Sequence, residues 1–288
     1  MMGWSLRAIV DLSDSEFDLW SKLLEARAGI QLTLAQKSLL QSQLAIRMRE
    51  LGYEHYSDYY SLVTDGLQGR LEWSILIDRV AVKETSFFRH RPSFEYVRRY
   101  LQSKIDNRQL NDSFDVWSVG CSTGEEPYSL AMVINDCFEL AQLEPYYGIT
   151  GLDISSTALA KARLGRYLPR AITQMTAEEA QRYCTLCNDG NYEIAGKLRD
   201  RVCFTHSNIL QVSEIPNVPM DVVFCQNLLV YFRRWLRRDI LNNLATRLKP
   251  GGLLVVGLGE VMDWEHPEMM RVADDKIQAY IRTEQKQQ

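Results

Sequence analysis

The chain has 288 residues, 46% of them hydrophobic and 24% charged, which is the composition of a soluble globular protein with one large domain or two modest ones. Its 33 basic and 37 acidic residues give a net charge of −4, which argues against nucleic-acid binding, and it contains neither a bilayer-spanning apolar run nor a secretion signal. We therefore expect a cytoplasmic protein without membrane insertion, with reduced cysteines and no metal site, because the lone Cys184–Cys187 pair has no second pair or histidines nearby.

Residues 1–81 have the apolar periodicity of helices. Ser13 and Glu16 form a capping box at the start of a first helix, which Gly29 ends. Further helices are predicted up to Gly52, over about residues 56–64, and over a segment that carries Leu71, Trp73, Ile77 and Val80. Short breaks that contain glycine join these helices, so we predict a small all-α N-terminal domain.

The segment from residue 79 to 99 differs in charge from the rest of the chain. It holds six basic and two acidic residues, a net charge of +4. Two interpretations are open: a basic linker whose Phe87 and Phe88 pack into a core, or a segment that brings Arg89 to an anionic substrate. The composition by itself favours the linker.

A strand, a loop of small residues and a helix N-terminus follow one another over residues 115–128, DVWSVGCSTGEEPY. A ligand can approach the backbone closely in the loop that starts at Gly120, and Pro127 suits the first turn of the helix. Phosphate-binding loops avoid negative charge, yet Glu125 and Glu126 stand here. Two carboxylates repel a pyrophosphate but suit a cation or a ribose, both of which S-adenosylmethionine carries. The alternative is that they only stabilise the helix dipole.

From residue 115 onward, predicted strands and helices alternate, which indicates an α/β fold with a parallel sheet and helices on both faces. A second strand covers Tyr147–Asp153, and an acid at such a strand end commonly binds ribose hydroxyls. Asn227 follows another predicted strand at its carboxyl end, where open α/β sheets bind ligands. The remaining predictions are strands at 202–204, 220–225, 253–258 and 277–282, and helices at 155–164 and 233–248.

The connection over about residues 166–201 is too long for a simple crossover. It contains a helical piece over 176–183 and a predicted hairpin, whose strands would be Tyr192–Ile194 and Arg199–Cys203 with Gly196 near the turn. Inserts of this length often act as lids or docking elements, and a purely structural insert is the other interpretation.

Four motifs along the chain occur together in one enzyme family. They are TSFFR at Thr85–Arg89, GCSTGEEPYS at Gly120–Ser129, GLDIS at Gly151–Ser155 and CQNLLVYF at Cys225–Phe232. Together they resemble the CheR family of S-adenosylmethionine-dependent methyltransferases, which esterify glutamates on bacterial chemoreceptors for sensory adaptation. The resemblance implies a helical domain at 1–81, a linker at 82–110 that contributes to the cofactor site, and a Rossmann-like class I methyltransferase domain at 111–288. A small β-subdomain would be inserted in the latter at about 166–201.

The resemblance also implies residue roles and a partner. Arg89 and Tyr231 would be the catalytic residues, nearest the transferred methyl and the incoming carboxylate. S-adenosylmethionine, or its product S-adenosylhomocysteine, would contact Lys83, Thr85, Arg89, Gly120, Glu126, Asp153, Asn208, Ile209, Gln226 and Asn227. The chain departs from the family at two of these positions, since Lys83 stands where the family usually has Asn, and Gln226 stands where Arg is frequent. The partner would be the cytoplasmic domain of a methyl-accepting chemoreceptor; the sequence leaves the particular receptor and the oligomeric state open.

The expected chemistry needs no general base, because a glutamate side chain with a pKa of about 4.3 is already a nucleophile at neutral pH. The enzyme has to align the carboxylate oxygen, the methyl carbon and the sulfur, which is worth roughly 7–11 kcal/mol in favourable cases. Two other classes stay open. A dinucleotide oxidoreductase is disfavoured by the Glu125–Glu126 pair and the glycine spacing. A methyltransferase-like binding module without turnover is disfavoured by the joint presence of Arg89, Glu126, Asp153 and Tyr231.

Overall fold

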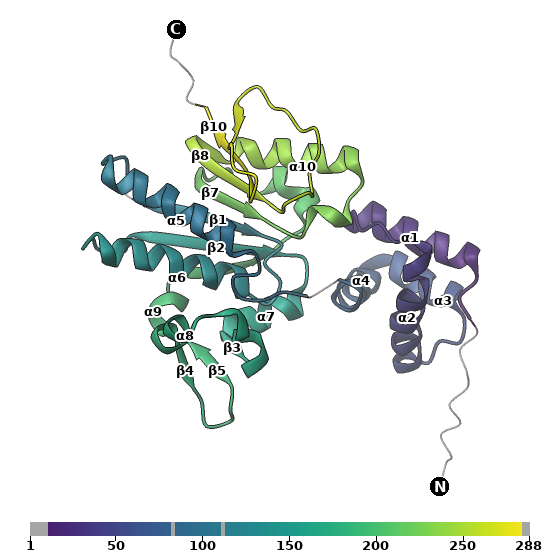
Figure 1. Ribbon diagram of the computed structural model, residues 1–288. Helices are drawn as coiled ribbons and strands as arrows, with labels where there is room; N and C mark the ends of the chain where they lie inside the picture. The colour runs from purple at the N-terminus through teal and green to yellow at the C-terminus, as the bar shows by residue number, and fades with distance from the viewer. Residues whose placement is uncertain (1–10, 82–83, 111–112, 284–288) are drawn as a thin grey trace. The chain divides into compact units, whose positions relative to one another are not determined.

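The computed structural model of the protein describes residues 11–81, 84–110 and 113–283. The chain divides into two compact units, residues 1–82 and 83–288 (Figure 1). Within the described ranges, no helix is both long enough and apolar enough to cross a bilayer.

The first unit is helical, as predicted. Ser13 and Glu16 form both hydrogen bonds of a capping box, and Gly29 and Gly52 end their helices in the left-handed conformation. The Trp20 ring packs against two tyrosines of the third helix in the centre of this unit. The elements are α1 (Asp14–Ala28), η1 (Leu34–Gln36), α2 (Lys37–Leu51), α3 (Tyr56–Thr64) and α4 (Gly66–Val80).

The second unit is built on a seven-stranded sheet with the order β6-β2-β1-β7-β8-β10-β9. The strands are β1 (Phe114–Val119), β2 (Tyr147–Asp153), β6 (Val202–His206), β7 (Met220–Cys225), β8 (Leu248–Val256), β9 (Met269–Arg271) and β10 (Gln278–Arg282). Strands β6 to β8 in this order are parallel, but β10 is antiparallel to β8 and to β9. The predicted parallel sheet is therefore confirmed for β6 to β8, while this edge is antiparallel because no crossover helix separates β8 from the strands that follow it.

Alternate residues of the central strands supply two different hydrophobic clusters, one on each face of the sheet. On β7, Val222 and Phe224 belong to one cluster, and Val223 and Cys225 to the other. The first face is covered by α5 (Arg91–Asp106) and α6 (Glu125–Leu140), and the second by α10 (Arg234–Thr246), as Figure 1 shows. Beside β2 and β6 lies α7 (Ser156–Leu164).

Most of the segment that we expected to be a linker is the helix α5. Its buried residues Phe94, Val97 and Leu101 recur at helical spacing, and this face packs on α6 and the sheet. Its positive charges are largely paired with acids from elsewhere in the chain. The ion pairs of the basic segment with other parts of the chain are Arg79–Glu50, Arg91–Glu179, Arg98–Asp136 and Arg99–Asp274, and Arg98 also pairs with Glu95 inside the segment.

The insert between β2 and β6 forms a small antiparallel sheet with the strand order β3-β5-β4. The predicted hairpin is wrong: Tyr192–Ile194 pairs with Cys184–Leu186 and with Arg166–Tyr167, and Gly196–Arg199 is a helical turn. The hairpin turns at Asp189-Gly190, a strong turn signal, where Gly190 has a φ of 79°. The elements are β3 (Arg166–Tyr167), η2 (Pro169–Gln174), α8 (Ala177–Tyr183), β4 (Cys184–Leu186), β5 (Tyr192–Ile194) and α9 (Gly196–Arg199).

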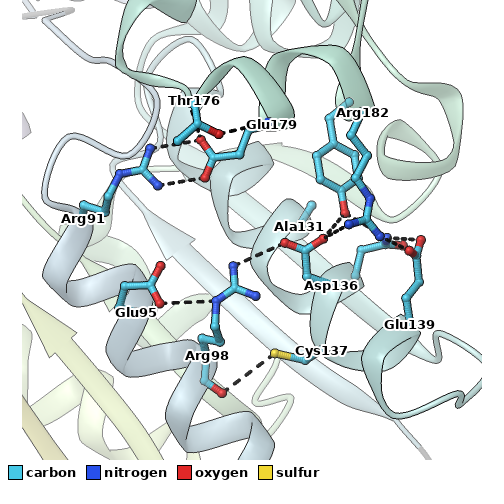
Figure 2. A network of polar contacts seen from close by, with 12 residues as sticks. Arg91, Glu95, Arg98, Ala131, Asp136, Cys137, Glu139, Thr176, Glu179 and Arg182 are labelled. Carbon is cyan, nitrogen blue, oxygen red and sulfur yellow. Dashed lines mark hydrogen bonds and ion pairs between the residues drawn. The ribbon is translucent and has the colours of Figure 1, made fainter.

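A network of ion pairs fastens this insert to the helices that cover the sheet (Figure 2). Arg91 of α5 donates two hydrogen bonds to Glu179 of α8, at 2.7 and 3.0 Å. Arg182, at the end of α8, pairs with Asp136 and Glu139 of α6. Because the insert is tied to both α5 and α6, the structure favours a fixed element of the fold over a hinged lid.

Candidate functional site

The parallel strands end at one edge of the sheet, and most of the predicted site residues follow these ends. The strand order reverses between β1 and β7, since the chain runs from β1 to β2 and β6 on one side and to β7 and β8 on the other. Ligands bind at such a switch point in open α/β sheets. The residues at this edge are Gly120 after β1, Asp153 at the end of β2, Asn208 and Ile209 after β6, and Gln226, Asn227 and Tyr231 after β7. Lys83 lies outside the described residues.

The loop after β1 is held in place by packing on both sides. Gly120 has a φ of 78°, and a Cβ there would lie 3.1–3.2 Å from the Leu228 side chain. Gly124 has a φ of 96°, and a Cβ there would lie 2.8 Å from Ala162 of α7. The positive φ of both glycines, and at Gly124 also the close contact with Ala162, disfavour any other residue there, with or without a ligand.

Asp153 joins this loop to the start of α7. Its carboxylate accepts one hydrogen bond from the Ser122 amide and one from the Ser155 amide, both at 2.8 Å. Burial raises the pKa of Asp153, and these two bonds oppose the rise. Each oxygen can accept a further hydrogen bond, so the carboxylate can hold the loop and still receive ribose hydroxyls.

Two more carboxylates stand at the N-terminus of α6. Glu126 accepts a hydrogen bond of 2.7 Å from the Ser118 hydroxyl of β1, and the buried Glu125 accepts one of 2.7 Å from Thr123. Burial raises the pKa of Glu126 to about 8; the charge of Glu260 adds to this rise and that of Arg89 opposes it. Burial also raises the pKa of Glu125. A site lined by carboxylates whose charge is costly favours a cationic ligand over a pyrophosphate.

The TSFFR segment places Arg89 at the surface by burying the two residues before it. The Phe87 ring contacts Tyr167 with 4.9 Å between centroids, and the Phe88 amide donates to the Ser129 hydroxyl of α6 at 3.1 Å. Phe88 has a φ of 51°, so the chain turns sharply there, and Arg89 is exposed with Nη1 donating to the Glu84 carbonyl at 2.8 Å. Thr85 is half-buried in the same segment. The interpretation that Phe87 and Phe88 pack into a core is therefore confirmed, and the approach of Arg89 to an anionic substrate stays a prediction.

Tyr231 lies in the short helix η4 (Leu229–Tyr231) that follows β7. It is half-buried, and burial raises its pKa, while the charge of Arg89 opposes this rise and the charges of Glu84 and Glu260 add to it. Tyr231 and Arg89, which come from distant parts of the chain, therefore lie within electrostatic reach of each other. The turn that leads to Tyr231 contains Asn227, exposed and with a φ of 58°.

Three of the predicted cofactor contacts have other partners within the chain. Gln226 is buried, and its Nε2 donates to the Ser93 hydroxyl of α5 at 2.7 Å and to the Val256 carbonyl at 3.3 Å. Its side chain thus joins α5 to the sheet. The Asn208 side chain caps η3 (Ile209–Glu214) by accepting from the Leu210 amide at 3.0 Å, and Ile209 is buried in the core.

Glu260, which our sequence analysis missed, is a buried carboxylate in the turn after β8. Its Oε2 accepts from the Gly257 amide at 3.0 Å, and Oε1 has no hydrogen-bond partner among the described residues. Burial raises its pKa, and the hydrogen bond from the Gly257 amide opposes the rise. Its position in the sequence could have indicated a site residue, because an acid shortly after a parallel strand lies at the ligand-binding edge of the sheet. No group of three or more metal-ligating side chains occurs within the described ranges.

The chain is similar to known proteins over most of its length. Residues 83–279 match the family described as CheR methyltransferase, SAM binding domain, and residues 15–81 match the CheR methyltransferase all-alpha domain. The chain is 31% identical over 252 residues to a chemotaxis protein methyltransferase of Salmonella typhimurium, covering 86% of this chain and 84% of that protein. It is 31% identical over 255 residues to chemotaxis protein methyltransferase 1 of Pseudomonas aeruginosa, covering 87% of this chain and 92% of that protein.

Proposed function

The chain belongs to the CheR methyltransferase family, and from this membership we propose that it methylates glutamate side chains of a bacterial chemoreceptor with S-adenosylmethionine. The products are glutamate methyl esters and S-adenosylhomocysteine, and the reaction serves adaptation in chemosensory signalling. The substrate is the cytoplasmic domain of the receptor, so the enzyme acts in the cytoplasm.

The residues at the sheet edge fit this cofactor. When bound, the cofactor supplies a methyl group on a positively charged sulfur. Glu126, with its raised pKa, can ionise beside a cationic ligand, and Asp153 retains acceptor capacity for ribose hydroxyls. Thr85, Gly120 and Asn227 would hold the cofactor at the same edge, and Asn208 and Ile209 would contact its adenine. Gln226 contributes indirectly, because its amide already bonds to Ser93 and Val256.

Arg89 and Tyr231 handle the substrate in this proposal. The observation that carries it is their convergence on one edge of the sheet. Phe88, next to Arg89, is bonded to Ser129 of α6, whose first turn contains Glu126, and Tyr231 follows β7, the neighbour of β1. The exposed guanidinium of Arg89 can grip a receptor carboxylate while that carboxylate loses its water. Tyr231 places its ring beside the path of the methyl group. No residue has to remove a proton, because the attacking carboxylate is already ionised.

The dinucleotide oxidoreductase alternative is set aside by the family match to an S-adenosylmethionine-binding domain. The binding-module alternative differs from the proposal only in turnover, so an assay of turnover decides between them.

The test is transfer of a radiolabelled methyl group to membranes that carry a chemoreceptor. The expected result is label on the receptor that mild alkali releases, as a carboxyl methyl ester requires. Matched membranes without receptor are the control. Binding of S-adenosylhomocysteine without any transfer to receptors from the same organism would favour the binding module, and absence of both would refute the proposed function.

A further inference from the structure

Arg237 of α10 bonds to the backbone on both sides of Tyr231. Its Nε donates to the Phe232 carbonyl at 2.8 Å, and its Nη2 to the Val230 carbonyl at 3.3 Å. The third nitrogen, Nη1, donates to the carbonyl of Glu260 at 2.9 Å. A single guanidinium therefore joins the segment that carries Tyr231 to the turn after β8. These are main-chain contacts, so they set the path of the segment without involving the Tyr231 side chain.

The Glu260 side chain holds the turn to which Arg237 is bonded. The residue is 5% exposed, and its Oε2 accepts a hydrogen bond of 3.0 Å from the Gly257 amide at the start of this turn. The Glu260 amide in return donates to the Gly257 carbonyl at 3.1 Å. A buried carboxylate left without its partner costs more than the bond itself contributes. Glu260 thus fixes the turn after β8, and Arg237 ties the segment that carries Tyr231 to this turn.

Gly257 makes room for this carboxylate. A Cβ at Gly257 would lie 2.4 Å from Oε2 of Glu260, a distance at which one of the two must move. The Gly257 amide also donates to that oxygen at 3.0 Å. The glycine is therefore specifically required by the side chain of Glu260.

We propose that Arg237 and Glu260 are positioning residues that hold residues 230–232 against the turn after β8, and thereby place Tyr231 for methyl transfer. The inference rests on the proposed function, because Tyr231 is its endpoint. Neither side chain needs to touch the substrate. A small displacement of a reacting group is enough to lower a rate by about a hundredfold, so the loss of either side chain should act mainly on turnover.

The primary experiment compares Glu260→Gln and Arg237→Gln with matched neighbours, Glu265→Gln and Arg238→Gln, whose side chains are exposed. In the full-length protein, we expect the two test variants to lower the single-turnover methyl-transfer rate by about tenfold or more. Their affinity for S-adenosylhomocysteine should stay within about threefold of wild type, and amide hydrogen exchange over 230–232 should become faster. The matched neighbours should change none of these. Test variants that transfer methyl at the wild-type rate would overturn the inference.

A double-mutant cycle separates positioning from general loss of structure. If Glu260 acts through Tyr231, then Glu260→Gln should cost little further rate in a Tyr231→Ala background; additive losses would overturn the inference. Gly257→Ala should reduce the rate in the wild-type background and cost little in a Glu260→Ala background. If Glu260→Gln does not fold, the same double-mutant cycle is measured with Arg237→Gln and Tyr231→Ala. An inactive wild type would instead count against the proposed function.

Discussion

At the scale of single residues, the site pairs carboxylates that are costly to ionise with an exposed arginine. The pKa of Glu126 is raised from its ordinary value to about 8 by burial and by Glu260. Without ligand, the unfolded chain therefore releases this proton at a lower pH than the folded protein does. The contribution of Glu126 to the free energy of unfolding is therefore largest at low pH. This contribution is lost as the pH rises through the pKa that Glu126 has in the folded protein.

Glu126→Gln should therefore flatten the pH dependence of stability of the ligand-free protein. Between about pH 5 and pH 8, wild type should lose more unfolding free energy than the variant, by up to a few kcal/mol, since one pKa unit corresponds to about 1.4 kcal/mol. Urea unfolding at the two pH values measures this difference, with the exposed Glu178→Gln as control. Equal pH dependence in wild type and variant would contradict the burial argument.

Arg89→Lys keeps the positive charge of the proposed carboxylate partner and removes its planar, two-pronged donor geometry. We expect normal folding and cofactor binding but a methyl-transfer rate reduced by about tenfold or more, because only interactions made in the transition state raise the chemical rate. Single-turnover kinetics with saturating receptor measure the effect. Arg99→Lys, at an exposed position of α5, is the control. A wild-type rate for Arg89→Lys would assign Arg89 to structure or cofactor binding.

At the scale of elements, the insert depends on a few partly buried ion pairs. Glu179→Gln should loosen it, because the glutamine still accepts from the Thr176 amide but loses its charge-assisted bonds with Arg91. We expect a local cost of about 1 kcal/mol, the upper end for exposed pairs. Faster amide exchange over 166–201, with the central strands unchanged, is the expected observation. The neighbouring exposed Glu178→Gln should leave exchange unaltered. Global destabilisation without local loosening would contradict this account of the insert.

At the scale of the whole molecule, the second unit contains everything that its core requires. Both hydrophobic clusters on the sheet consist of residues from this unit alone. We therefore expect residues 83–288, expressed without the first unit, to unfold cooperatively and to bind S-adenosylhomocysteine within about threefold of the full chain. Calorimetry measures both properties. A non-cooperative transition or lost binding would show that the first unit is needed to complete the fold or the site.

The sequence by itself determined the elements whose signals are local. The capping box at Ser13, the glycine ends of α1 and α2, and the strands Tyr147–Asp153 and Met220–Cys225 agree with prediction, because each is encoded in contiguous residues. The family also followed from short motifs, and the order of the strand ends brought most predicted site residues to one edge.

Only the tertiary structure decided which distant residues meet. The strand Tyr192–Ile194 has partners on both sides, and its apolar pattern does not distinguish among them. Gln226 follows a site strand, but its amide bonds to Ser93, a residue of a helix we had not predicted. Glu260 and Arg237 belong to no motif, and their role arises because two loops and a helix converge on Tyr231. Such contacts depend on the close packing of segments far apart in the chain, which periodicity along a single segment does not encode.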